Sequence, residues 1–122
     1  GIQMGTRMLC CSDSPVHANW KDAVITAKET DTVFLNQQSR PALRALRTAR
    51  TAELALLGKF DMVEHMANLQ ALYFGGDMEA AIPLSGQVAG RINAILSAGE
   101  IIEQTVAEFD GIMQGLAKQY TC

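Results

Sequence analysis

The sequence contains few of the residues from which metal or nucleophilic sites are built. The three cysteines, Cys10, Cys11 and Cys122, are odd in number and lack zinc-type spacing, so neither a disulfide framework nor a zinc site is expected. The two histidines, His17 and His65, have no third ligand and no nucleophile at a suitable spacing. We therefore predict no metal site and no catalytic residue within this chain.

Long apolar runs and an excess of positive charge are also missing. No apolar segment approaches the roughly 20 residues that a membrane-spanning helix needs, and no signal peptide is visible. The formal net charge of −3 gives no general attraction to nucleic acid or to an anionic membrane. We expect a cytoplasmic location, with neither nucleic acid nor membrane as a partner.

What the sequence does contain is enough apolar side chain for one compact core, with helical patterns along most of its length. Hydrophobic residues make up 48% of the 122 residues, and a chain of this size buries roughly two-thirds of its unfolded surface. Ser14-Pro15 is typical of a helix start, and Gly75-Gly76 of a helix end. Apolar spacing of three and four residues predicts helices over 15–29, 60–73, 77–82 and 86–96.

The clearest helix is the last one. Ser97 and Glu100 have the spacing of a capping box, which predicts that a helix begins there. Apolar side chains then follow at alternating steps of four and three, which places them on one face of that helix. They are Ile102, Val106, Phe109, Met113 and Leu116.

The middle of the chain allows two interpretations. Thr32-Val33-Phe34-Leu35 predicts a short strand. Ala, Leu and Arg then favour a helix over 42–57 that Gly58 ends, although Pro41 fits an edge strand as well as a helix start. On a helix, the arginines of this segment would form one basic stripe able to meet an acidic partner. They are Arg40, Arg44, Arg47 and Arg50.

The N-terminal residues are typical of a strand that leads into a phosphate-binding corner. Met4, Gly5 and Thr6 end the run Gly1–Thr6 with a glycine that lets the backbone approach an anion and a threonine whose hydroxyl adds a donor. We expect a strand over Ile2–Leu9, which without barrel neighbours would leave its edge groups unpaired and is then disordered, pairs with a partner chain or packs in a new way. Because such a corner normally follows a large sheet or barrel, we expect the chain to be the tail of something longer. Whether Gly1 is a natural start stays open.

Further motifs follow this corner in a recognisable order. They are Leu9, Ser12–His17, Glu29–Val33, Gly76–Ala81 and Ser85–Gly90. In this order the chain resembles the C-terminal third of the FMN-dependent nitronate monooxygenase (2-nitropropane dioxygenase) family and of the related flavin enoyl-acyl carrier protein reductases. The resemblance favours a strand rather than a helix at the start of 40–47.

This resemblance implies a TIM barrel that binds FMN at its mouth and carries a lid domain after its last strand. A TIM barrel needs about 200 residues or more, so the chain is not a complete barrel. The resemblance assigns residues 1–9 to a remnant of the last strand and 10–122 to a helical, lid-like domain. It places Met4, Gly5 and Thr6 at the FMN phosphate. It also places Ser85, Gly86 and Gln87 along the site.

We expect a mainly α domain of about five helices with at most a short two-stranded β element, which is α+β in the family context. The isolated chain is expected to bind no cofactor and to be inactive alone. The first hypothesis is a truncated or detached lid that serves as a non-catalytic binding or assembly module, in a homodimer. The alternative is the C-terminal portion of an FMN-dependent oxidoreductase that needs an upstream or separate barrel for activity.

Overall fold

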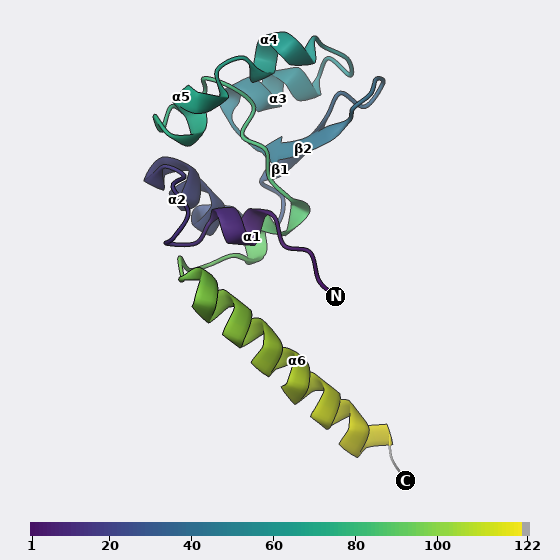
Figure 1. Cartoon of the computed structure of the whole chain (residues 1–122). Coiled ribbons are helices and arrows are strands. Elements are labelled where there is room, and N and C mark those ends of the chain that lie inside the picture. Colours follow the sequence, from purple (N-terminus) through teal and green to yellow (C-terminus); the bar gives the residue numbers. More distant parts are fainter. Residues whose placement is uncertain (121–122) are drawn as a thin grey trace.

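The structure is a computed structural model that describes residues 1–120, and its elements are shown in Figure 1. The described part is mainly helical, contains one two-stranded antiparallel sheet and is not a closed barrel, as predicted. In chain order the elements are α1 (Thr6–Leu9), α2 (Ala18–Thr26), β1 (Thr32–Leu35), β2 (Leu43–Leu46), α3 (Ala49–Ala55), α4 (Met62–Met66), α5 (Leu69–Tyr73), the 3₁₀ helix η1 (Gln87–Arg91) and α6 (Ala98–Tyr120).

One core cluster lies against the small sheet. Strands β1 and β2 pair in antiparallel register, with Phe34 opposite Arg44. Val33, Leu35 and Ala45 are buried together with apolar side chains from outside the sheet, Leu54 of α3 and Ile82. A bridge between Ala45 and Leu84 places the segment before η1 beside β2. The sheet therefore fixes the chain just before residues 85–87.

A second core cluster lies among α2, α5 and η1. Trp20 and Val24 of α2 and Leu72 of α5 are fully buried, and Ala89 of η1 belongs to the same cluster. His17 begins α2, where its Nδ1 atom accepts a hydrogen bond from the N–H of Asn19 at 3.1 Å. This cluster holds η1 against α2.

The helix predicted over 42–57 is wrong in its first half. Residues Leu43–Leu46 form strand β2, because pairing with β1 satisfies their backbone groups and outweighs local helix propensity. Helix α3 begins only after Thr48, which forms a capping box with Thr51. The basic stripe is therefore absent: Arg44 lies on the sheet with its guanidinium 5.7 Å from the centre of the Phe34 ring, whereas Arg50 is on α3.

Three other predicted helices are shorter than expected. The helix over 15–29 spans only Ala18–Thr26, because His17 rather than Ser14 caps it. The helix over 60–73 is two helices, α4 and α5, with Asn68 at the N-cap of the second. The helix over 86–96 is reduced to η1 over Gln87–Arg91, and 77–82 form turns and bends rather than a helix.

The strand predicted over Ile2–Leu9 is also wrong. Residues Thr6–Leu9 form helix α1, in which the N–H of Leu9 donates to the carbonyl oxygen of Gly5 at 3.1 Å. No strand lies beside this segment in the described part of the chain, so a strand here would leave its backbone groups without partners. Cys10 and Cys11 are buried in the turn that follows α1 instead of at a strand end.

Helix α6 extends away from the rest of the molecule (Figure 1). The predicted capping box is confirmed: the Glu100 carboxylate accepts from the N–H of Ser97 at 2.8 Å, and the Ser97 hydroxyl accepts from the N–H of Glu100 at 3.2 Å. Ile101 is the buried residue of this helix, and residues 106–120 are all exposed. None of the described helices is both long and apolar enough to cross a bilayer.

Candidate functional site

The two segments singled out in the sequence meet in the structure. The N–H of Gly86 donates to Oγ1 of Thr6 at 2.6 Å, although 80 positions separate these residues in the chain. Thr6 and Ser85 are both buried, and the N–H of Ser85 donates to the carbonyl oxygen of Arg44 at 3.2 Å. The sheet thus holds 85–87 in place, and 85–87 in turn hold the start of α1.

The start of α1 has the properties of an anion-binding corner. Gly5 occupies the N-cap without a side-chain capping bond, and the first N–H groups of a helix have no partner within the helix. A Cβ atom built on Gly5 would meet nothing within 4 Å, so the space before the backbone is open. The Thr6 hydroxyl accepts the bond from Gly86 and keeps its own proton to donate. Backbone and side-chain donors therefore lie together.

The remaining predicted site residues differ in burial and in the free space around them. Met4 is partly buried just before α1, and Gln87 is exposed at the start of η1. Gly86 has little free space, because an added Cβ would lie 3.2 Å from Oγ1 of Thr6. Gly90 is closer still to its neighbours, with an added Cβ at 2.5 Å from the backbone N of Glu29. The small residues of 85–90 thus serve close backbone packing.

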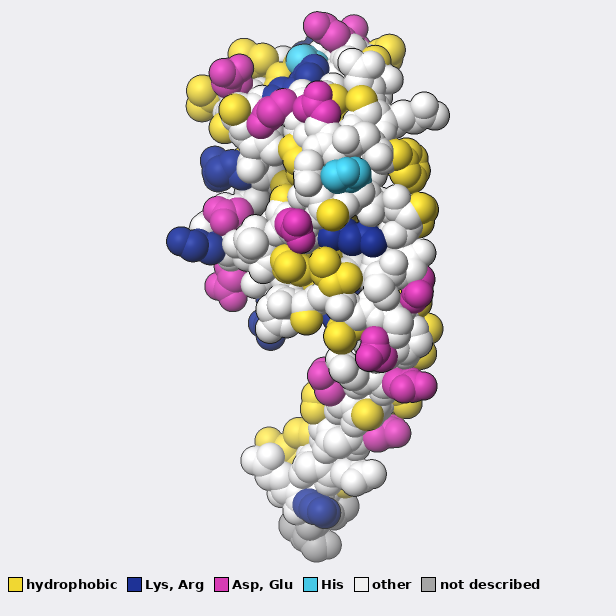
Figure 2. Space-filling view, turned by 90° about the vertical axis from the view of Figure 1, so that its left-hand side faces the viewer, with side chains coloured by type: hydrophobic (Ala, Val, Ile, Leu, Met, Phe, Trp, Pro, Cys, Tyr) yellow, Lys and Arg dark blue, Asp and Glu magenta, His cyan; other side chains and the backbone are white. Residues whose placement is uncertain are grey.

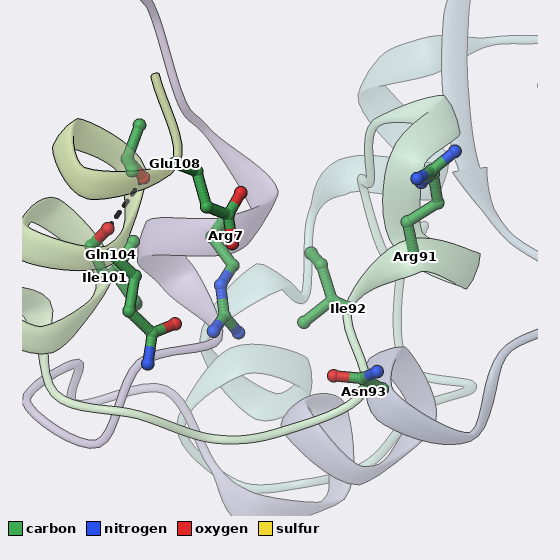
Figure 3. Close-up of a pocket in the computed structure, with 8 residues that line it drawn as sticks. Arg7, Arg91, Ile92, Asn93, Ile101, Gln104 and Glu108 are labelled. Carbon is green, nitrogen blue, oxygen red and sulfur yellow. Dashed lines mark hydrogen bonds between the residues drawn. The ribbon is translucent and has the colours of Figure 1, made fainter. Parts of the chain in front are cut away.

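A polar cleft beside this corner was not predicted from the sequence. It has a volume of about 380 Å³ and is lined by residues of α1, η1 and α6. The Arg7 side chain reaches into it between α6 and Ile92 (Figure 3). One guanidinium N–H of Arg7 donates to the carbonyl oxygen of Ala94 at 2.6 Å. Arg91 and Glu108 line it as well. Three segments that are distant in sequence form the cleft, so no local sequence pattern predicts it.

The polar cluster around Arg50 has a structural role. Its guanidinium donates to the carbonyl oxygens of Glu79 at 2.8 Å and Ala80 at 3.1 Å. The Glu79 carboxylate accepts from the N–H groups of Ala49 and Arg50, the first of α3. Arg50 also lies 3.1 Å from Nδ1 of His65, which must be the acceptor because arginine has no lone pair to offer. The cluster ties α3 and α4 to residues 79–80.

Burial favours the protonated forms of the Cys10 thiol and the Tyr73 phenol. Desolvation raises the pKa of the Cys10 thiol, against the smaller opposite effect of Arg7. Burial also raises the pKa of Tyr73, whose hydroxyl lies 3.5 Å from the carbonyl oxygen of Leu84. A thiol held in this form is a poor nucleophile. Among the described residues, no group of three or more His, Cys, Asp or Glu side chains is arranged to hold a metal ion.

Comparison with known proteins shows which family this chain resembles in sequence and structure. Residues 1–108 match the sequence model of the nitronate monooxygenase family. The structure is similar to that of FabK from Thermotoga maritima, with a TM-score of 0.86 and 27% identity over 98% of this chain and 40% of that one. A point mutant of FabK from the same organism gives a TM-score of 0.80 and 30% identity over 98% of this chain and 36% of that one.

The similarity covers this chain almost completely but only part of its relatives. The chain spans 36–40% of the length of the two FabK chains. No curated protein sequence is significantly similar to it. Since the family match extends over residues 1–108, most of the sequence, the chain belongs to the nitronate monooxygenase family.

Proposed function

We propose that this chain is the C-terminal portion of an FMN-dependent oxidoreductase of its family, and that it acts only together with a barrel. The observation that carries the proposal is the 2.6 Å hydrogen bond between Gly86 and Thr6. It keeps the corner over Met4, Gly5 and Thr6 joined to Ser85, Gly86 and Gln87.

The residues present fit the phosphate end of FMN. Gly5 leaves open space before the first N–H groups of α1, and the Thr6 hydroxyl retains a proton to donate. When bound, FMN supplies the redox chemistry of this class of enzyme. In our proposal Gly5 and Thr6 bind and orient its phosphate, whereas Gly86 fixes the Thr6 side chain. The lid excludes water above the site.

The corner alone is too small to retain the cofactor. A few donors on one short segment must offset the entropy lost when a large ligand and a free segment are ordered together. The isolated chain is therefore expected to remain free of FMN, and binding is expected only when a barrel supplies the other contacts. The substrate is expected to lie between that barrel and the lid.

A charge substitution at Gly5 tests the proposal. We would exchange the corresponding part of full-length Thermotoga maritima FabK for this chain and follow quenching of FMN fluorescence by the resulting full-length chimera. The change Gly5→Asp places a carboxylate beside the phosphate, whereas Gly5→Asn has nearly the same shape without the charge, and both are good N-cap residues. We expect Gly5→Asp to bind FMN at least tenfold more weakly than Gly5→Asn.

Two results would contradict the proposal. Equal FMN affinity of the two variants would show that the FMN phosphate does not bind at this corner. Tight FMN binding by the purified chain alone would show that no barrel is required for cofactor binding.

The exposed apolar face of α6 favours a second candidate, the non-catalytic assembly module in a homodimer. Phe109 is 59% exposed and Met113 51% exposed, and apolar surface of this kind marks an interaction site. Light scattering of the purified chain tests this candidate. A monomer at high micromolar concentration would exclude it, and a stable dimer would support it.

A further inference from the structure

The contact between Arg50 and His65 joins α3 to α4 through one side chain that stays charged and one that titrates. Nη2 of Arg50 lies 3.1 Å from Nδ1 of His65. A guanidinium has donors only and keeps its proton in proteins, so Nδ1 is the acceptor and carries no hydrogen. The contact therefore exists only while His65 is neutral, with its proton on Nε2.

The guanidinium of Arg50 is fixed in place by the segment that follows α5. Its Nη1 donates to the carbonyl oxygens of Glu79 at 2.8 Å and Ala80 at 3.1 Å. The backbone N–H of Arg50 also donates to the Glu79 carboxylate at 2.9 Å. The guanidinium can turn away from His65 only by giving up the two carbonyl bonds. If a second positive charge arises beside it, the imidazole is thus the group that moves.

The position of His65 is linked to the core through its own backbone. Its carbonyl oxygen accepts a hydrogen bond from the N–H of Ile82 at 3.2 Å, and Ile82 is fully buried. The ring of His65 lies edge-on to that of Phe60, with 5.2 Å between the ring centres. A displacement of His65 is therefore expected to reach the buried amide of Ile82.

The imidazole borders a cleft that also carries carboxylates. This cleft has a volume of about 450 Å³, and its charged and titratable lining residues are Arg50, His65, Glu53 and Glu79. The other charged groups on the adjoining segments are all exposed: Lys59, Asp61, Glu64 and Asp77. Figure 2 shows histidine, basic and acidic side chains together at the end of the molecule that α3 and α4 form. An imidazolium there is repelled by Arg50 and attracted by the acids of the cleft.

We propose that the contact between Arg50 and His65 is an acid-sensitive latch. It holds α4 against α3 and residues 79–80 while His65 is neutral, and it opens when His65 is protonated. Histidine is the side chain whose charge ordinarily changes between about pH 5 and 8. Protonation puts a hydrogen on Nδ1, so the acceptor is lost and two cations face each other. The latch does not involve the corner at Thr6, and it does not rest on the proposed function.

Hydrogen exchange of the Ile82 amide at pH 8 and pH 5 tests the latch in the 122-residue chain. The rates are corrected for the intrinsic pH dependence of exchange, so that protection factors are compared. The test variant His65→Asn keeps an acceptor oxygen but does not titrate. The control variant His17→Asn removes the other histidine and leaves a good N-cap residue on α2. The reference amide is that of Leu46, which donates to the carbonyl oxygen of Pro83 at 2.9 Å.

We expect the protection of Ile82 to fall at least tenfold from pH 8 to pH 5 in the unsubstituted chain and in His17→Asn. In His65→Asn it should stay within twofold, and the Leu46 amide should not follow the fall in any of them. Nitrogen NMR of the unsubstituted chain at pH 8 should place the His65 proton on Nε2, which tests the contact without any substitution. Constant protection of Ile82, an equal fall in His65→Asn or at Leu46, or a proton on Nδ1 at pH 8 would overturn the latch.

Discussion

Gly86 donates its backbone N–H to the side-chain oxygen of Thr6 at 2.6 Å, and this bond joins the segment just before η1 to the start of α1. Because Thr6 is buried, its hydroxyl is the partner that allows the Gly86 N–H to leave water. The bond therefore fixes the position of residues 85–87 relative to the start of α1.

Replacing Thr6 by valine tests the contribution of this bond to stability. The variant has nearly the same shape but leaves the N–H of Gly86 without an acceptor, which costs about 1–3 kcal/mol for a buried group. Urea unfolding followed by circular dichroism measures the change. Thr6→Ser keeps the hydroxyl and is expected to lose less than half as much, so equal losses in the two variants would show that packing matters more than the bond.

Gly90 is expected to tolerate no side chain. A Cβ atom there would lie 2.5 Å from the backbone N of Glu29 and 2.5 Å from the backbone carbon of Lys28. Backbone atoms cannot move aside as a flexible side chain can, so Gly90→Ala should cost about 1–3 kcal/mol or more. Gly99→Ala is the control, because an added Cβ there meets nothing within 4 Å. A thermal melt in which both variants match the parent chain would contradict the close packing of η1 on α2.

The start of α6 is expected to respond to acid. Hydrogen bonds from the Ser97 hydroxyl and backbone N–H hold the pKa of the Glu100 carboxyl below its ordinary value. The stabilisation is therefore complete above the ordinary pKa and is lost as the pH falls through the lowered pKa. An NMR titration of Glu100 measures this directly. In Ser97→Ala the pKa should move back toward the ordinary value, and an unchanged titration would show that the cap does not form.

The outer half of α6 should become more helical when its glycines are replaced. Gly111 and Gly115 lie on the face of α6 opposite Val106 and Phe109, and a Cβ atom on either would meet nothing within 4 Å. Glycine in a helix interior costs about 1 kcal/mol relative to alanine. The double variant Gly111→Ala, Gly115→Ala should therefore show more ellipticity at the helix minimum and a later helix melt. A loss of helicity would mean that these positions contact something the described chain does not include.

Local signals predicted the elements that depend on local contacts. Ser97 and Glu100 form their capping box within four residues, and Thr32-Val33-Phe34-Leu35 forms the predicted strand. Residue propensity did not predict strand Leu43–Leu46. Propensity reflects the local sequence, whereas this strand forms by pairing with β1, which lies outside the segment. Asn68 divides one apolar periodicity into two helices at a point where the spacing of apolar residues gives no sign.

The candidate site was only partly accessible from the sequence. Glycine and threonine at the corner have recognisable chemistry, and the family resemblance assigned both this corner and residues 85–87 to one site. The hydrogen bond between Gly86 and Thr6 was not predicted, because 80 positions separate the two residues in the chain. The cleft at Arg7 was missed because α1, η1 and α6 build it jointly. Periodicity identified the apolar face of α6, but it could not tell a face that packs within the chain from one that remains exposed.

The hydrogen bond between Thr6 and Gly86 also bears on how members of this family diverge. The polypeptide between these residues leaves and re-enters the scaffold at one point, and insertions are best tolerated where the two ends of a segment lie close together. The segment between Thr6 and Gly86 can thus be lengthened, shortened or exchanged during evolution without displacing either residue. A chimera that carries the corresponding segment of another relative between Thr6 and Gly86 is therefore expected to keep both ends of that segment in place.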